Sequence, residues 1–188
     1  VFSTLAIFVN TSVVYAQPCE PLQIAKLLAS DGIGYERFGN YVAVSGNTAI
    51  IGATWDGDNG EWSGSVYLFD ITTGEQIAKL LPDDGASRDF FGNKIAISGN
   101  TAIIGAFGDD DYTGSAYIFD VTTHSQIAKL KPADLNPGDE FGTSVAISGN
   151  TAVVGTSYGN NYLGSAYLFS NNGSGWEQYA KLIASDGE

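Results

Sequence analysis

The sequence predicts an all-β protein built from repeated four-stranded antiparallel sheets, and three observations lead to this fold class. The chain repeats itself with a period of 50 to 53 residues, which is typical of propellers and solenoids. Each repeat contains two short hairpins, and no stretch of ten or more residues has helical spacing. The second strand of each repeat is apolar on both faces, as in a sheet that is covered on both sides. Together these features predict a β-propeller fragment with three blades.

Fixed and variable intervals alternate within the repeat. Lys26, Lys79 and Lys129 each lie 13 residues before the glycine of a Phe-Gly pair, and that glycine lies 13 residues before a Gly-Ala or Gly-Thr pair. The next interval, to a Gly-Ser pair, is 12, 9 and 9 residues long. Fixed intervals indicate packed framework, whereas variable intervals indicate surface loops that tolerate insertion.

Four strands are expected in each repeat, and in the first repeat they cover residues 41–45, 48–53, 65–70 and 76–80. The turn at Gly46-Asn47 joins the first two strands, because glycine readily takes a positive φ. The blades are expected at about residues 35–80, 88–130 and 138–183. Residues 22–28 are expected to form the outer strand that closes the ring, here without its partner, so the exposed blade face should promote self-association.

The first 16 residues carry no charge and contain a short apolar stretch. With Val14 and Ala16 before Gln17, they are interpreted as the remnant of a secretory signal peptide, the alternative being a buried strand. The protein is therefore expected to be secreted or on the cell surface. Cys19 would then pair with a cysteine beyond residue 188 or remain a free thiol.

The formal net charge of −13, from 21 acidic and 8 basic residues, argues against nucleic acid and anionic lipid as partners. The apolar stretch at the start is too short to span a bilayer comfortably. Cations, neutral ligands such as sugars, and proteins remain possible partners.

Three copies of one motif carry a resemblance to a known family. Phe38-Gly39 precedes Gly52-Ala53, and the later copies are Phe91-Gly92 with Gly105-Ala106 and Phe141-Gly142 with Gly155-Thr156. Each copy is followed by Gly-Ser-x-Tyr-x-Phe. This pattern resembles the FG-GAP repeat of integrin α-chain heads and of many secreted bacterial and algal proteins. The resemblance implies an extracellular propeller for adhesion or ligand binding, with the remaining blades of the same chain as neighbours.

The family's usual calcium loop, Asp-x-Asp-x-Asp-Gly, is replaced here by Gly-Asn turns that offer no carboxylate. Acidic residues gather instead in the loop after Gly-Ala, and calcium binds clustered oxygen ligands of this kind. The candidate calcium ligands are Asp56, Asp58, Asp109, Asp110 and Asp111. The alternative is that they are ordinary polar turn residues.

The same loop places one aromatic residue two positions before each Gly-Ser pair: Trp62, Tyr112 and Tyr162. They are candidate ligand-binding residues that could stack on sugars, or rings that cover the edge of the neighbouring blade. Glu36, Asp89 and Asp139 lie two positions before each Phe-Gly pair and are expected to accept turn N–H bonds.

No catalytic residues are expected, because the sole histidine, His124, lies in a turn far from any candidate nucleophile or base. The expected function is a non-enzymatic extracellular binding or adhesion module that binds a protein or glycan. The alternatives are a carbohydrate-binding lectin, or the propeller module of a larger secreted hydrolase.

Overall fold

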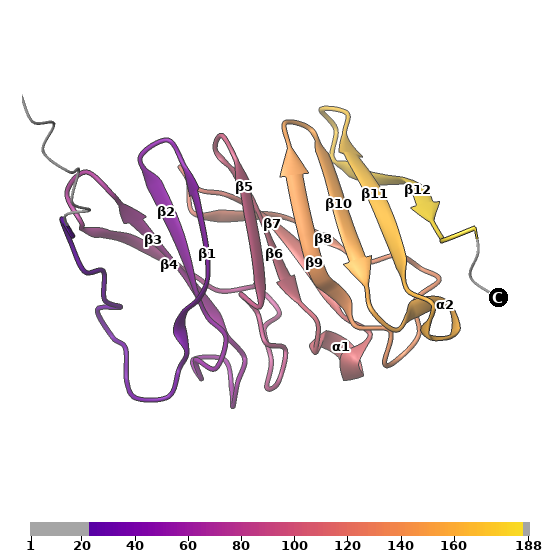
Figure 1. Cartoon of the computed structure of the whole chain (residues 1–188), viewed down its shortest axis with the longest axis horizontal. Coiled ribbons are helices and arrows are strands. Elements are labelled where there is room, and N and C mark those ends of the chain that lie inside the picture. Colours follow the sequence, from indigo (N-terminus) through magenta and orange to yellow (C-terminus); the bar gives the residue numbers. More distant parts are fainter. Residues whose placement is uncertain (1–22, 186–188) are drawn as a thin grey trace, which may run out of the picture.

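The computed structural model describes residues 23–185 and confirms the all-β fold class. Three four-stranded antiparallel sheets, which we call blades 1, 2 and 3, stand side by side in chain order (Figure 1). Blade 1 contains β1 (Phe38–Ser45), β2 (Thr48–Ala53), β3 (Ser65–Asp70) and β4 (Gln76–Leu80). Blade 2 contains β5 (Lys94–Ser98), β6 (Thr101–Ala106), β7 (Ser115–Asp120) and β8 (Ser125–Leu130). Blade 3 contains β9 (Phe141–Ser148), β10 (Thr151–Thr156), β11 (Ser165–Asn171) and β12 (Trp176–Leu182).

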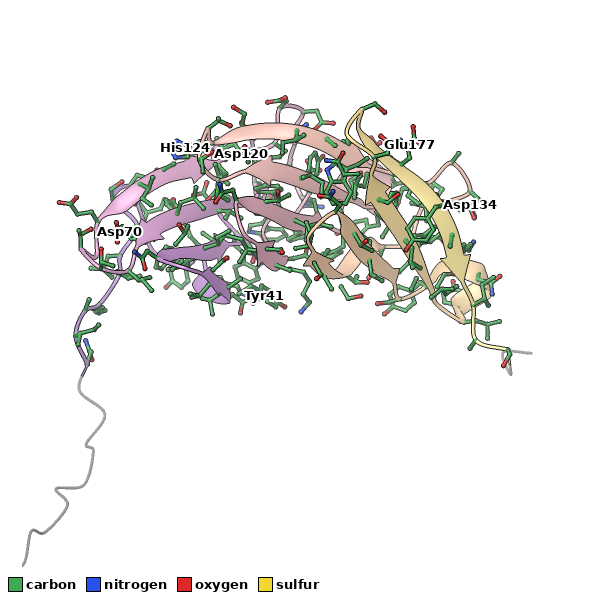
Figure 2. The ribbon with its side chains drawn as sticks, turned by 90° about the horizontal axis from the view of Figure 1, so that it is seen from above. Tyr41, Asp70, Asp120, His124, Asp134 and Glu177 are labelled. Carbon is green, nitrogen blue, oxygen red and sulfur yellow. The ribbon has the colours of Figure 1, made fainter. Side chains whose placement is uncertain are left out.

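Within each blade the strands pair in sequence order, from one edge of the sheet to the other. The first strands, β1, β5 and β9, adjoin one another and form the inner edge. Tyr41 on β1 therefore lies on the opposite side of the molecule from Asp120 and His124, which belong to an outer hairpin (Figure 2). This radial arrangement of sheets is that of successive propeller blades.

The four strands predicted for the first repeat are confirmed, and only β1 is longer than expected. It begins at Phe38 because a register shift between Phe38 and Tyr41 lets the Phe-Gly segment pair with Ala53 before the regular ladder starts. Ser45 pairs with Thr48 across the predicted turn at Gly46 and Asn47.

The apolar cores lie between the blades. Adjacent residues of β2 point to opposite faces, so Ile50 packs toward blade 2 while Ile51 packs on the other side of the sheet. Ile103 and Ile104 of β6 divide in the same way between blade 3 and blade 1. The two-sided apolar pattern of the sequence therefore reports burial on both faces, as predicted.

Close backbone contacts join the loop end of each blade to the next one. The N–H of Phe91 donates to the carbonyl of Ser63 between blades 1 and 2 (2.9 Å), and the N–H of Phe141 donates to that of Thr113 between blades 2 and 3 (3.0 Å). A Cβ on Gly64 would overlap the backbone of Phe91, so only glycine fits there. The same approach recurs in the next repeat, where a Cβ on Gly114 would overlap the backbone of Phe141.

Residues 23–29 are assigned to no strand, and the closing strand expected at residues 22–28 stays a prediction, because its expected partner strand is not among the described residues. A strand needs a hydrogen-bonded neighbour, and no described strand lies beside this segment. Leu27 and Ala29 pack near Tyr67 and Phe69, against the face of blade 1 that points away from blade 2. Residues 1–16 and Cys19, with the predictions made for them, lie outside the described residues.

Two single-turn helices that the sequence did not predict follow the second strands of blades 2 and 3. They are α1 (Asp109–Tyr112) and α2 (Gly159–Tyr162). A single turn is too short to produce a periodic apolar pattern, and Asp110 and Asp111 have left-handed φ values that interrupt the helix.

The contact between Gly64 and Phe91 predicts a large effect of Gly64→Ala. Gly39→Ala is the matched control, because Gly39 also has a positive φ (+89° against +83°) but would meet no atom within 4 Å. The free energy of unfolding of the control should fall only by about 1–2 kcal/mol, the cost of placing a residue with a Cβ in a left-handed conformation. That of Gly64→Ala should fall by a further ~1–3 kcal/mol, because the new methyl group overlaps the backbone of Phe91. Urea unfolding measures both values, and equal losses would contradict the proposed contact.

The face of blade 1 that points away from blade 2 is expected to promote self-association. Val42 and Val44 are 64% and 60% exposed there, whereas the equivalent Ile95 and Ile97 pack in the core between blades 1 and 2. The 188-residue chain should sediment as more than a monomer at micromolar concentration, and the double change V42D/V44D should reduce its association. The control I77D/I127D changes two exposed outer-strand residues instead. A monomer in the unmodified chain would contradict the prediction.

Candidate functional site

Loops from successive blades meet at one end of the sheets. The N–H groups of Arg88 and Phe90, which enter blade 2, donate to the carbonyls of Glu61 (2.8 Å) and Trp62 (3.1 Å) in the loop of blade 1. The carbonyl of Tyr112 takes the corresponding role between blades 2 and 3. Candidate side chains at this end are therefore carried by backbone that is hydrogen-bonded across blade boundaries.

Each blade contains one tyrosine, one lysine and one aspartate in contact, which we call the Tyr–Lys–Asp cluster. In blade 1 the Tyr67 hydroxyl donates to Asp31 (2.9 Å), and Nζ of Lys79 lies 2.8 Å from the same carboxylate. The Lys79 ammonium also lies 5.1 Å from the centre of the Tyr67 ring. The clusters are Asp31, Tyr67 and Lys79; Asp84, Tyr117 and Lys129; and Asp134, Tyr167 and Lys181.

Blades 1 and 2 add a buried carboxylate to their clusters. Asp56 and Asp109 are 1% and 4% exposed, and each lies four residues after the glycine of its Gly-Ala pair. Asp56 lies 2.8 Å from Nζ of Lys79, and Asp109 lies 2.8 Å from Nζ of Lys129. Asp58 adds a third carboxylate beside Lys79, at 2.7 Å. A buried charge needs such a partner, so these aspartates hold the loop against the outer strand.

The electrostatics of the clusters follow from this pairing. Burial alone would lower the pKa of Lys79, but the hydrogen bonds that its ammonium donates to Asp31, Asp56 and Asp58 outweigh burial and leave that pKa raised. Burial raises the pKa of Tyr117, and the nearby carboxylates raise it further. The lysines therefore remain ammonium ions, and the tyrosine hydroxyls remain hydrogen-bond donors.

Four of the five aspartates predicted as calcium ligands are bound to lysines. Asp56 and Asp58 bind Lys79, Asp109 binds Lys129 and Asp110 binds Lys131. Asp111 is exposed. Within residues 23–185, no group of three or more His, Cys, Asp or Glu side chains is placed to hold a metal ion. The calcium prediction gains no support from this arrangement and stays a prediction.

A row of aromatic rings crosses the loop end of blades 1 and 2, and we call it the aromatic row. Trp62 lies between Trp55 (5.7 Å between ring centres) and Phe90 (6.1 Å), which belongs to the segment entering blade 2. The row continues from the ring of Phe90 to that of Phe107 (4.9 Å between ring centres) and from Phe107 to Tyr112 (6.1 Å). Trp62 and Tyr112 therefore pack with neighbouring rings in the row.

Both arginines of the sequence lie on this row. The guanidinium carbon of Arg37 is 3.4 Å from the centre of the Trp55 ring, and that of Arg88 is 5.4 Å from Trp62. Such cation–π contacts orient each guanidinium, and one N–H of Arg88 also donates to the Glu61 carboxylate (3.4 Å), so the remaining N–H groups are left for other acceptors.

Tyr162, the third aromatic candidate, lies in a different environment. It is 82% exposed, compared with 36% for Trp62 and 37% for Tyr112, because the segments that enter blades 2 and 3 lie beside Trp62 and Tyr112 and no corresponding segment is described beside Tyr162. Its ring contacts that of Tyr158 edge-on, with the ring centres 6.0 Å apart. The structure therefore brings two of the three predicted ligand-binding aromatics into one row and leaves the third at the separate loop of blade 3.

A pocket of about 550 Å³ opens beside this loop. Its lining includes Asp134 and Lys181 of the third cluster, and Figure 2 shows Asp134 beside β12. Tyr158 and Tyr162 complete an aromatic side, while Asn136, Asp139 and Asn160 contribute polar groups. A concave site with a few convergent polar groups is the usual form of a small-ligand site.

The turn-stabilising role expected for Glu36, Asp89 and Asp139 is confirmed. Their side chains accept backbone N–H groups three residues earlier, at 3.0, 2.6 and 2.8 Å respectively. Each carboxylate closes the turn that precedes a Phe-Gly pair.

The roles of the lysines and arginines were not predicted from the sequence. Lys79, Lys129 and Lys181 recur at a fixed place in the repeat, and that recurrence is the signal from which their pairing with recurring aspartates could have been inferred. The two arginines do not recur, so no pattern pointed to them.

The environment of Asp89 predicts a pH-dependent stability. Burial raises the pKa of Asp89 from 3.8 to about 6, with the neighbouring Asp109 adding to the rise. Because the folded chain holds this proton more tightly than the unfolded chain, the contribution of Asp89 to the free energy of unfolding falls as pH rises from about 3.8 to about 6. Asp89→Asn should therefore raise stability at pH 7.5 by on the order of 1–2 kcal/mol and leave it nearly unchanged at pH 4.

Denaturant unfolding at the two pH values measures this difference. Asp139→Asn, the same position in blade 3 but less buried, is the control and should show a smaller effect. A gain that is equal at both pH values would contradict the assignment to Asp89 ionisation.

Comparison with known proteins gives one clear match. A sequence model of the FG-GAP repeat matches three segments of the chain, residues 22–69, 75–119 and 124–169. FG-GAP repeats are typical of extracellular proteins and of adhesion or binding modules, and their propeller fold is typically non-catalytic. No curated protein matches the sequence. Among the described residues, no helix has the length and apolar character needed to cross a membrane.

Proposed function

The chain belongs to the FG-GAP repeat family, and we propose that it is a non-enzymatic extracellular module that binds another protein through the aromatic row and its arginines. The single observation that carries this proposal is the row itself. It is a partly exposed run of tryptophan, phenylalanine and tyrosine rings on which both arginines lie.

The composition of the row supports a protein partner. Tryptophan, tyrosine and arginine are the residues that most often dominate the energy of protein interfaces. Arg37 is exposed, and the side chain of Arg88 is 57% exposed. In a chain with a net charge of −13, these guanidinium groups offer a local site for a partner carboxylate.

The surface beside the row is concave, which supports the same proposal. A pocket of about 370 Å³ lies between residues 33–36 and the loop that contains Trp55, Glu61 and Trp62. An apolar side chain of a partner could enter this pocket while its carboxylates reach Arg37.

The framework beneath the row favours preorganised binding. Trp62 and Phe90 come from different blades, and the backbone hydrogen bond between them (3.1 Å) fixes their relative position. A surface held in this way loses little conformational entropy when a partner binds.

Carbohydrate binding is the second candidate, and a specific observation favours it at blade 3. Tyr158 and Tyr162 line a polar pocket there, whereas Trp62 and Tyr112 lie within the aromatic row. The lectin proposal therefore concerns blade 3 and not all three loops. The further alternative, a module of a secreted hydrolase, stays a prediction.

Solid-phase binding to a panel of purified extracellular matrix proteins tests the proposal. Trp62→Ala and Arg88→Glu should each weaken binding to the responding protein at least tenfold, or about 1.4 kcal/mol. Tyr162→Ala, at the same loop position in blade 3, and Lys131→Glu, with the same change of charge, are the matched controls and should bind like the unmodified chain.

Melting temperatures of all four variants must first show that they fold. Binding that is lost equally in variants and controls would contradict a role for the aromatic row. The absence of binding to any protein of the panel, together with binding on a glycan array, would favour the carbohydrate candidate over the protein-binding one.

A further inference from the structure

Blade 3 breaks the repeat at one buried position. Asp56 in blade 1 and Asp109 in blade 2 occupy the fourth position after the glycine of Gly-Ala, and Gly159 occupies it in blade 3. Both aspartates place a carboxylate against the lysine of their cluster. Departures from internal symmetry are informative in repeat proteins, because packing alone would favour the same residue in every copy.

The substitution leaves the third lysine with fewer acceptors. Among the described residues, Lys79 lies within ion-pair distance of three carboxylates and Lys129 of two, whereas Lys181 contacts Asp134 alone, at 2.7 Å. The ammonium of Lys181 therefore lacks the second, buried carboxylate that both of its counterparts have.

A second change in the same loop compensates for the first locally. Thr156 replaces the alanine of Gly-Ala, and its hydroxyl accepts the N–H of Gly159 (2.7 Å) while donating to the carbonyl of Asp139 (2.7 Å). The threonine hydroxyl thus holds the backbone of the loop together, but it supplies no negative charge to Lys181. The lysine instead borders the 550 Å³ pocket described above.

We propose that this pocket binds a sugar acid, whose carboxylate pairs with Lys181 at the place where blades 1 and 2 use their own aspartate. The hydroxyl groups of the sugar would bond to Asp139, Asn136 and Asn160, and its ring would lie against Tyr158 or Tyr162. Carboxylates, amides and tyrosine rings are side chains that bind hydroxyl groups and the apolar faces of sugar rings. The inference does not use the aromatic row; it rests on the second, carbohydrate-binding candidate at blade 3 and names the class of sugar and the residue that recognises it.

The other carboxylates of the pocket do not exclude an anionic group. Blade 2 places Asp109 beside Lys129 although Asp84 contacts the same lysine and Asp89 lies nearby. Blade 1 gathers three carboxylates around one ammonium. The same framework in blade 3 can therefore accept one more carboxylate near Lys181, and a ligand can supply it.

Isothermal titration of the 188-residue chain with glucuronate, glucose and acetate tests the proposal. Glucuronate should bind with a Kd of about 1 mM or tighter, and glucose and acetate at least tenfold more weakly, because each lacks one half of the recognised group. Equal binding of glucose and glucuronate would overturn the role of the carboxylate. The absence of any glucuronate binding at about ten times that concentration would overturn the proposal.

The double variant T156A/G159D provides the sharpest test, because it restores the residues of blades 1 and 2. Both changes are needed, since a Cβ on Gly159 would overlap the hydroxyl of Thr156. The new aspartate should pair with Lys181, so the variant should melt at the same or a higher temperature while its affinity for glucuronate falls at least tenfold.

Two controls separate occupation of the site from other effects. T156A alone should bind glucuronate like the unmodified chain, and T156A/S157D adds the same charge at an exposed neighbouring position and should retain most of the affinity. Unchanged binding by T156A/G159D, or equal losses in T156A/S157D, would overturn the proposal. Trp62→Ala should leave glucuronate binding unchanged, so failure here and failure of the protein-binding proposal are distinguishable.

Discussion

Direct contact between the backbones of successive blades is the constraint on which the rest of the structure depends. Gly64 and Gly114 approach the Phe-Gly segment of the following blade so closely that no side chain fits between them. This contact brings Phe91 and Phe141 into the cores between the sheets, where both rings are fully buried. The glycine of each of these Gly-Ser pairs and the Phe-Gly pair of the following repeat thus act together across a blade boundary and not within one blade.

The same constraint explains why candidate function gathers at one end of the molecule. Once the glycine contacts fix how the sheets stack, the loop after each second strand lies against the segment that enters the next blade. The Tyr–Lys–Asp clusters then tie that segment to the outer strand, which leaves only the loop tips free to differ. The aromatic row and the pocket of blade 3 are both built from these loops on a common framework.

Much of the fold could be predicted because it is local and repeated. The Gly46-Asn47 turn, the alternation of Ile50 and Ile51 between two faces, and the turn carboxylates Glu36, Asp89 and Asp139 each follow from a few neighbouring residues. The segment at residues 23–28 could not be predicted in the same way. Its composition suits a strand, but a strand forms only where a partner offers hydrogen bonds.

The sequence by itself determined the repeat, the strands and the positions of the glycines, because each depends on the spacing of residues along the chain. Only the tertiary structure decided which charges and rings meet. Asp56 could be a metal ligand until Lys79, 23 positions later in the chain, is found beside it. Trp62 could be a sugar-stacking residue until Phe90 of the next blade, 28 positions later in the chain, is found packed against it. The physical reason is that pairing energies depend on distances in space, and residues far apart in the chain become neighbours only when the sheets pack.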